Sequence, residues 1–283
     1  MKSSLFLSVA MFSYFICMVM HFTYIYFKNK KFGQAITLVA ILGVAVQTVG
    51  LGLRWYESYQ AGHGHVPLSN LYESLVSLSW TTVLVYLGIE YRYKTRALGV
   101  LIFPIVSIAL AYASLSPNIA DEIEPLVPAL QSNWLTYHVI TCFLSYSAFA
   151  ISFGASLVYL FKQKKAAAPS AAEQGGDHAL SIKTLDDIIY KTVSIGFLLL
   201  SIGIITGAVW ANYAWGSYWS WDPKETWSLI TWFIYASFIH ARMTRGWRGK
   251  RIAMLSIFGF ACVLFTFLGV NFILSGLHSY GAN

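Results

Sequence analysis

Eight apolar stretches, each long enough to cross a lipid bilayer, limit what this chain can fold into. A helix needs roughly 20 apolar residues to span the hydrocarbon core. The stretches lie near residues 3–27, 34–54, 71–90, 97–115, 134–161, 187–210, 223–242 and 252–276. Glycine and proline inside several of them are tolerated in lipid, where neighbouring helices satisfy the freed backbone groups. The pattern predicts an all-α polytopic membrane protein with about eight transmembrane helices.

The composition of the chain fits this class. Apolar residues make up 57% of the 283 residues and charged residues only 11%, with a mean hydropathy of +0.59. A soluble domain would carry about a quarter charged residues. One membrane domain therefore accounts for nearly the whole sequence. Its first stretch is too long, and too poorly matched to a cleavage site, for a signal peptide, so we expect it to be retained.

Basic residues are concentrated in alternate connections. Three follow the first stretch, three follow the third, five flank the segment after the fifth and five follow the seventh, which makes 16 of the 19 Lys and Arg residues. Only Lys2, Arg54 and Lys224 fall on the opposite side. Because cytoplasmic loops carry the excess of Lys and Arg, both termini are predicted to lie on the outer side. The net charge of +7 is thus a topology signal and does not indicate nucleic-acid binding.

Two connections and the cysteines complete the organisation of the chain. Residues 163–180, rich in Ala, Gly and Ser, predict a flexible cytoplasmic linker. Residues 115–132 contain three acidic residues and three prolines, and they are predicted to lie on the outer face. The three cysteines all fall within apolar stretches and form no Cys-x-x-Cys pair. They predict neither a disulfide framework nor a zinc site.

The connection near residues 210–227 holds five of the ten tryptophans. An interfacial belt of aromatic residues also enriches Trp and Tyr, but it places one or two at each helix end. The close spacing of Trp215, Trp219 and Trp221 exceeds that, and it favours a surface for a flat apolar ligand. A flat aromatic platform with imidazoles nearby is the arrangement that a haem needs.

The tryptophan-rich connection ends at a predicted helix start. Asp222 is placed as the N-cap, Pro223 at the first helical position and Glu225 at the third. Lys224 and the free amides of this first turn form a locally positive end. Such an end suits the propionate of a haem, so Asp222 and Lys224 are candidate site residues. Arg54, on the same predicted side, could pair either with a propionate or with Glu57.

Three histidines are candidate iron ligands. His138 begins the fifth stretch and His278 follows the eighth, so the predicted topology places both at the outer surface beside the tryptophans. His240 lies within the seventh stretch, where an ionisable group is costly and suggests a functional site. It is roughly 25 Å along the helix from residue 223, so it would belong to a second haem position. We interpret His21 as a packing residue, and His63 and His65 as solvated or hydrogen-bonded.

The run Trp-Gly-Ser-Tyr-Trp-Ser-Trp-Asp-Pro-Lys-Glu at residues 215–225 resembles the WWD signature of the haem-handling proteins of c-type cytochrome biogenesis. Within this superfamily the chain is similar to the CcsA (ResC) family of system II cytochrome c maturation. Further segments that carry the resemblance are residues 67–74, 134–139, 238–242 and 276–281. The resemblance covers most of residues 50–283. It divides the chain into N-terminal transmembrane helices, 1–54, and a haem-handling membrane domain, 55–283, with its WWD loop at 210–227.

The resemblance implies a set of ligands and partners. His138 and His278 match the two outer histidines that act as axial ligands to haem b, iron protoporphyrin IX, in this family. His240 matches a histidine of an intramembrane haem site whose other ligand lies in the partner CcsB (ResB). The large outer domain of CcsB is not found in this sequence, so we expect the unfused form. The other expected partner is apocytochrome c with its Cys-x-x-Cys-His segment.

These matches lead to a functional expectation. The chain would be the haem-binding subunit of the system II cytochrome c synthase, a haem lyase, and would present haem at the outer face for thioether attachment. Its expected location is a bacterial plasma membrane or a thylakoid membrane, with the WWD loop on the periplasmic or lumenal side. Two alternatives stay open, namely a haem carrier of the CcmC type without synthase activity and an electron-transfer membrane cytochrome b. CcmC-type proteins have about six spans, and a cytochrome b would enclose its histidine pairs.

Overall fold

The computed structural model describes residues 2–27, 29–117, 119–166, 181–274 and 276. All regular structure in these ranges is helical, which confirms the predicted all-α class. The elements are α1 (Lys2–Phe27), α2 (Lys30–Gln60), α3 (Leu71–Tyr93), α4 (Gly99–Leu115), η1 (Pro128–Leu130), α5 (Asn133–Ala166), α6 (Ile182–Trp215), α7 (Pro223–Thr244), α8 (Lys250–Leu264), the π-helical turn η3 (Phe265–Gly269) and α9 (Val270–Ile273).

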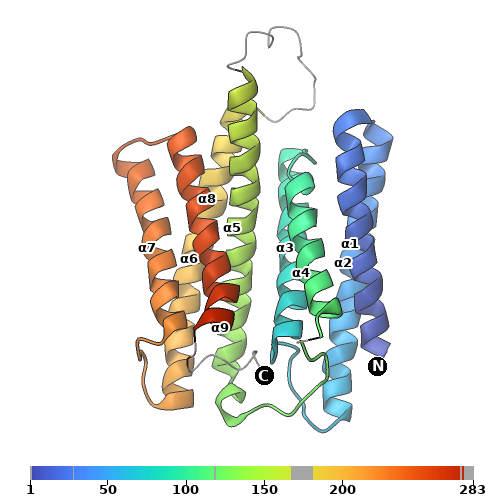
Figure 1. Ribbon diagram of the computed structural model, residues 1–283, viewed down its shortest axis with the longest axis vertical. Coiled ribbons are helices and arrows are strands. Elements are labelled where there is room, and N and C mark those ends of the chain that lie inside the picture. Colours follow the sequence, from blue (N-terminus) through green and yellow to red (C-terminus); the bar gives the residue numbers. More distant parts are fainter. Residues whose placement is uncertain (1, 28, 118, 167–180, 275, 277–283) are drawn as a thin grey trace.

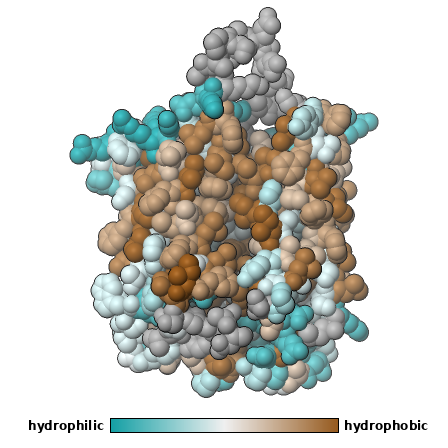
Figure 2. Space-filling view, in the orientation of Figure 1, coloured by the Kyte–Doolittle hydropathy of each residue, from teal (hydrophilic) through white to brown (hydrophobic). Residues whose placement is uncertain are grey.

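Among the described residues, five helical segments are long and apolar enough to cross a membrane: α1, α2, α5, α6 and the continuous run Lys250–Ile273. Helix α4 is apolar but has only 17 residues. On the face shown in Figure 2, apolar side chains cover the middle of the molecule, while polar ones gather towards its two ends. The protein is therefore an integral membrane protein, and the count of eight spans stays a prediction.

The long helices run side by side, so each connection lies at one of two ends of the bundle (Figure 1). The start of α1, the end of α9 and the α6–α7 connection share the lower end in this view, which we call the cavity end. The end of α1, the start of α2, the end of α5, the start of α6 and the α7–α8 connection share the upper end, which we call the basic end. Helix α1 packs on α2 and α4, α3 packs on α4 and α5, and α5 packs on α6 and α8.

Helices α5 and α6 approach closely because α6 presents glycine to α5. A methyl group added at Gly196 would lie 2.6 Å from the Phe149 ring, and one added at Gly203 would lie 2.8 Å from Cys142 Sγ. Ser145 Oγ donates a hydrogen bond of 2.7 Å to the carbonyl oxygen of Gly196. Small residues and such hydrogen bonds drive helix association in lipid, where apolar side chains alone do not.

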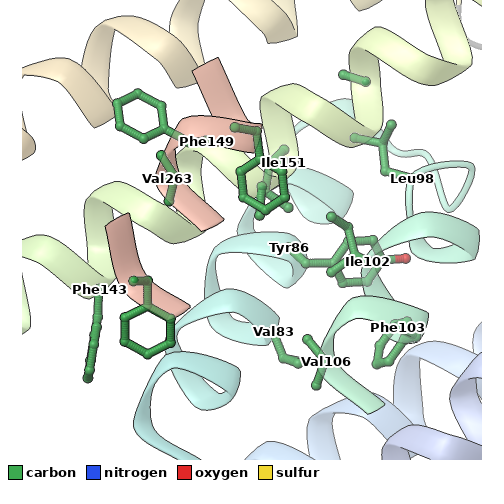
Figure 3. Close-up of a cluster of buried hydrophobic side chains, with 14 of the residues drawn as sticks. Val83, Tyr86, Leu98, Ile102, Phe103, Val106, Phe143, Phe149, Ile151 and Val263 are labelled. Carbon is green, nitrogen blue, oxygen red and sulfur yellow. The ribbon is translucent and has the colours of Figure 1, made fainter. Parts of the chain in front are cut away.

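The core lies where α3, α4, α5 and α8 meet, and Figure 3 shows apolar side chains from these helices filling it. Phe103 of α4 and Phe149 of α5 are fully buried there. Buried hydroxyls cross-link the same helices, since Ser152 Oγ lies 2.6 Å from Ser256 Oγ. This packing fixes the ends of α5 and α6, on which the site described below is built.

Several predicted boundaries differ from the observed ones, and those of the α6–α7 connection and of the linker bear on the organisation of the chain. Helix α6 continues to Trp215 and ends at Gly216, whose φ of +75° is the left-handed conformation that closes a helix. The segment predicted as a loop, 210–227, is therefore helical at both ends, and only residues 216–222 lie between the helices. Helix α5 reaches Ala166, so the predicted linker 163–180 begins as helix, and 167–180 lies outside the described residues.

Candidate functional site

The predicted start of α7 is confirmed by its hydrogen bonds. Asp222 is the N-cap, and its Oδ1 accepts a hydrogen bond of 2.9 Å from the amide of Lys224. Glu225 Oε2 accepts from the amides of Asp222, at 3.2 Å, and Ser220, at 2.8 Å. This capping box holds the backbone on both sides of Trp221. Residues 216–222, which we call the WWD connection, are thus a fixed structure attached to the first turn of α7.

Trp221 has a strained backbone conformation. Its φ is +61°, which is uncommon for a bulky residue. Its side chain is 69% exposed, and its ring meets that of Trp219 edge to face at a centroid distance of 5.7 Å. Such strain persists only where the surroundings impose it, and it concentrates at functional sites. Here the Glu225 hydrogen bonds impose it, and the result is an indole directed away from the bundle.

His138 is held against the backbone of α6. Its Nδ1 lies 2.7 Å from the carbonyl oxygen of Gly203. A carbonyl oxygen only accepts, so in the neutral ring Nδ1 carries the proton and Nε2 keeps its lone pair. This arrangement is typical of metal-binding histidines. Gly207 makes the approach possible, because a methyl group there would lie 2.6 Å from His138 Nδ1. The imidazole also stacks on Trp210, at 6.1 Å and 15°.

A cavity of about 180 Å³ lies beside His138 at the cavity end of the bundle. It is formed by α3, η1, α5, α6, the WWD connection, α7, η3 and α9. Its polar or aromatic lining residues are Ser69, Asn70, Ser74, His138, Tyr146, Trp210, Tyr218, Trp219, Lys224, Glu225, Ser228, Thr266, Phe267 and Asn271, together with the Cys142 thiol. Lys224 Nζ donates a hydrogen bond of 3.0 Å to Asn271 Oδ1 within it.

The structure brings three of the predicted site residues to this cavity, His138, Trp219 and Lys224. The Asp222 carboxylate caps α7 and lies against Gly276, since a methyl group added at Gly276 would lie 2.3 Å from Asp222 Oδ2. Trp215 is half-buried behind the cavity, and its ring lies 4.9 Å from that of Trp210. His278 lies outside the described residues, two positions after Gly276.

Arg54 does not line the cavity. It is fully buried, and its Nε lies 2.7 Å from Glu73 Oε1, which replaces the Glu57 partner considered from the sequence. Its Nη2 donates to the carbonyl oxygens of Asp121, at 2.8 Å, and Glu122, at 3.3 Å. Arg54 therefore anchors the acidic connection between α4 and α5. Glu57 itself accepts hydrogen bonds from Ser3.

His240 is exposed on α7, near the basic end and far from His138. His21 is buried instead, with Nδ1 2.8 Å from the Cys17 carbonyl oxygen and Nε2 3.1 Å from the Tyr86 hydroxyl. These contacts confirm its interpretation as a packing residue. His65 is hydrogen-bonded as well, with Nε2 2.9 Å from the Glu124 carbonyl oxygen.

Among the cavity residues that were not predicted from the sequence are Trp210, Tyr218 and Asn271. Trp210 was counted with the aromatic run, but its position on α6 opposite His138 depends on how far that helix continues. Asn271 could have been found, because a polar side chain inside an apolar stretch is a functional candidate by default. Tyr218 carried no feature that separates it from the neighbouring aromatic residues.

The fold and this site define a class, an integral membrane protein with a histidine-lined cavity beneath a tryptophan-rich connection. A family model described as "Cytochrome C assembly protein" matches residues 68–278. Among curated relatives, the cytochrome c biogenesis protein CcsA of Heterosigma akashiwo is 45% identical over 262 residues, covering 82% of this chain and 80% of the relative. CcsA of Guillardia theta is 41% identical, covering 94% and 92%, and CcsA of Prochlorococcus marinus (strain MIT 9313) is 40% identical, covering 87% and 84%.

A solved structure titled "Cytochrome c Heme Lyase CcmF" matches 94% of this chain and 46% of its own chain, with a TM-score of 0.71 and 16% identity. At that identity it shows the shared fold alone. The family model and the relatives show more: the chain belongs to the CcsA proteins of the cytochrome c assembly family. The resemblance found in the sequence is thereby confirmed, and the chain takes part in cytochrome c maturation.

Proposed function

We propose that this chain is the haem-binding membrane subunit of a system II cytochrome c synthase and presents haem b at the outer face for attachment to apocytochrome c. The observation that carries this proposal is the His138–Gly203 hydrogen bond of 2.7 Å at the cavity wall. It assigns the proton of the neutral ring to Nδ1 and the lone pair to Nε2, and it fixes the imidazole in orientation. A positioned nitrogen of this kind is what an axial iron ligand requires.

The second axial ligand in this proposal is His278. Its support is the position of Gly276, two residues earlier, against the Asp222 carboxylate and the Pro223 ring. That contact places Gly276 at the start of α7, whose Lys224 and Glu225 line the same cavity as His138. Asp222 would accordingly act on the proposed site indirectly, because it caps α7 and contacts Gly276, two positions before His278.

The cavity residues fit a haem that is only partly enclosed. A cavity of about 180 Å³ is smaller than the roughly 300–1,000 Å³ of pockets that enclose drug-sized ligands. The rest of the porphyrin would lie over the WWD connection, where Trp219 and Trp221 present their rings. Lys224 is the cation within the cavity, and its ammonium group would pair with a propionate. Partial enclosure suits a haem that must be handed over.

When bound, haem would supply two reactive parts. Its iron would take two imidazole ligands, and its vinyl groups would accept the thiols of the apocytochrome. The role of this chain is to hold the haem in a fixed position relative to the apocytochrome, which makes the reaction between the two effectively intramolecular. The hydrogen bond to Gly203 would fix the His138 imidazole, and this imidazole would in turn set the orientation of the porphyrin plane. The indoles would exclude water from one face of the porphyrin. Neither a general base nor a nucleophile is required of the cavity residues. The histidine of the Cys-x-x-Cys-His segment would then replace one of the two resident imidazoles.

A second haem position is proposed at His240. Its imidazole is exposed on α7 within an apolar stretch, where an uncovered polar group is costly in lipid. A partner helix that brings another ligand would cover it, and we assign that role to CcsB. This site would be incomplete in the isolated chain. The cavity end would face the periplasm or the thylakoid lumen, and the basic end the opposite compartment.

The proposal is tested by co-expressing the chain with CcsB and a c-type apocytochrome and staining for covalently bound haem. We expect His138→Gly to abolish the covalent product, and exogenous imidazole to restore part of it. His63→Gly is the matched control, since His63 lies at the same end but does not line the cavity. A normal yield from the His138→Gly/His278→Gly double variant without imidazole would refute the ligand assignment. Bound haem with no covalent product from the wild type would favour the carrier alternative.

A further inference from the structure

A second cavity, of about 660 Å³, lies at the basic end of the bundle. It is bounded by the end of α5, the first turns of α6 and the connection between α7 and α8, residues 245–249. Figure 2 shows polar residues gathered over the α7–α8 side of this end. The cavity shares no lining residue with the one beside His138, so it is a separate feature of the molecule.

The lining of this cavity is strongly cationic. Its five basic residues are Lys183, Arg245, Arg248, Lys250 and Arg251. Among the described lining residues the only carboxylate is that of Asp186, and it is already engaged. Arg242 binds it with both guanidinium nitrogens, at 3.0 and 2.7 Å, and the amide of Gly249 donates to it at 3.0 Å. The positive charge of the lining is thus not balanced within the cavity.

The α7–α8 connection, which forms one wall of this open cavity, is a defined turn. Gly246 and Gly249 have φ values of +62° and +67°, which favour glycine. The amide of Trp247 donates to the carbonyl oxygen of Ala241 at 3.1 Å. Gly249 packs on α5, because a methyl group there would lie 2.6 Å from the Tyr159 hydroxyl. Together with the Asp186 hydrogen bond, these contacts fix the loop that carries Arg245 and Arg248.

Apolar side chains lie at the rim of the same cavity. Ile182 is 38% exposed and Trp247 is 37% exposed, and both line it. The Arg251 guanidinium lies 5.5 Å from the centre of the Trp247 ring. Tryptophan beside basic residues at the end of a membrane helix is typical of the headgroup level of a bilayer. The cavity therefore offers cations for an anionic group and an apolar rim for what is attached to it.

We propose that this cavity binds the headgroup phosphate of an anionic phospholipid. Arginine favours phosphate because its planar guanidinium presents paired donors. Basic pockets between transmembrane helices are the kind of site that lipid headgroups occupy. A free phosphate would use the arginines but not Ile182 and Trp247, so the apolar rim favours the lipid. Bound lipid would clamp the α7–α8 connection to α5 and α6, and so stabilise the fold at this end.

The test measures the unfolding temperature of the purified full-length chain in detergent as phosphatidylglycerol is added. A ligand that binds only the folded state raises this temperature by mass action. We expect phosphatidylglycerol to raise it, and phosphatidylcholine and inorganic phosphate at equal concentration to leave it unchanged. Arg245→Gln/Arg248→Gln should shift the half-saturating lipid concentration upward about 25-fold, at roughly fivefold for each basic residue.

The matched control is Lys30→Gln/Lys31→Gln, which removes the same charge from exposed positions in the first turn of α2, at the same end. It should leave the lipid response unchanged. An equal shift in both double variants, or none in the arginine pair, would overturn the proposal in favour of general surface charge. A response to inorganic phosphate equal to that of the lipid would overturn the lipid assignment. The response should persist in His138→Gly, which separates this site from the proposed haem site.

Discussion

The imidazole of His138 is oriented by the main chain of the neighbouring helix, since its Nδ1 lies 2.7 Å from the carbonyl oxygen of Gly203. A backbone carbonyl within a helix has a fixed position, so the ring inherits the rigidity of α6. The same carbonyl determines which nitrogen carries the proton in the neutral ring. In metalloproteins such outer partners affect metal affinity about 10–100-fold, although they do not touch the metal.

Gly207→Ala should displace His138. The added methyl group would lie 2.6 Å from His138 Nδ1, so the ring must move or the helices must separate. We expect haem affinity of the purified chain to fall about 10–100-fold, as for other disturbed outer partners. Gly88→Ala is the control, because nothing lies within 4 Å of a methyl group at Gly88. Haem content measured by absorbance should separate the two variants, and equal content would contradict this role of Gly207.

Trp221→Gly should reduce haem retention without lowering stability. Glycine adopts the φ of +61° without the strain that Trp221 has there. This relief of strain offsets the larger loss of backbone entropy that glycine undergoes on folding. The exposed indole is lost, and with it a proposed stacking face for haem. Trp55→Gly, within α2, should do the reverse, lowering the unfolding temperature while haem stays bound. If Trp221→Gly lowers the unfolding temperature as much as Trp55→Gly does, the strain interpretation fails.

Arg54→Met should destabilise the chain by about 3–5 kcal/mol, because it leaves the Glu73 carboxylate buried and unpaired. Arg54→Met/Glu73→Met should recover most of that loss, since a buried ion pair adds little over apolar side chains of similar size. Unfolding temperatures of the three proteins measure both effects. A stable Arg54→Met chain that loses haem would instead assign Arg54 to a propionate, the role considered from the sequence.

Lys224→Gln should weaken haem binding while axial ligation is retained. The change removes the cation of the cavity, and a hydrogen bond to a charged group contributes about 1.5–3 kcal/mol, or roughly 10- to 150-fold in affinity. The control is Lys2→Gln, which removes a basic residue outside the cavity at the same end. Haem titrations of both variants test the role. Unchanged affinity in Lys224→Gln would exclude a propionate contact.

The sequence alone predicted the class of fold and the local structure at the start of α7. The length of the apolar stretches predicts the helices. The order Asp222, Pro223, Glu225 predicts an N-cap whose hydrogen bonds all join residues close in sequence. It could not predict the partner of Arg54, because Glu57 is close in sequence whereas Glu73 is brought near by the packing of α2 against α3. Contacts between distant segments depend on the packing of whole helices.

The same limit applies to the candidate site. His138 was identified as a candidate from its position, but the partner that fixes its tautomer, Gly203, carries no side chain by which a sequence pattern could mark it. The length of α6 decides whether Trp210 faces His138, and the apolar pattern ended that helix five residues early. His240 was predicted within a span, whereas its exposure follows only from the packing of α7.

The most direct test of the central claim is the absorption spectrum of haem bound to the purified chain, compared between wild type, His138→Gly and His63→Gly. We predict that the wild type and His63→Gly show iron with nitrogen ligands on both faces. His138→Gly should lose that spectrum and recover it when imidazole is added. An unchanged spectrum in His138→Gly, at the same haem content and without imidazole, would contradict the assignment of His138 as the axial ligand.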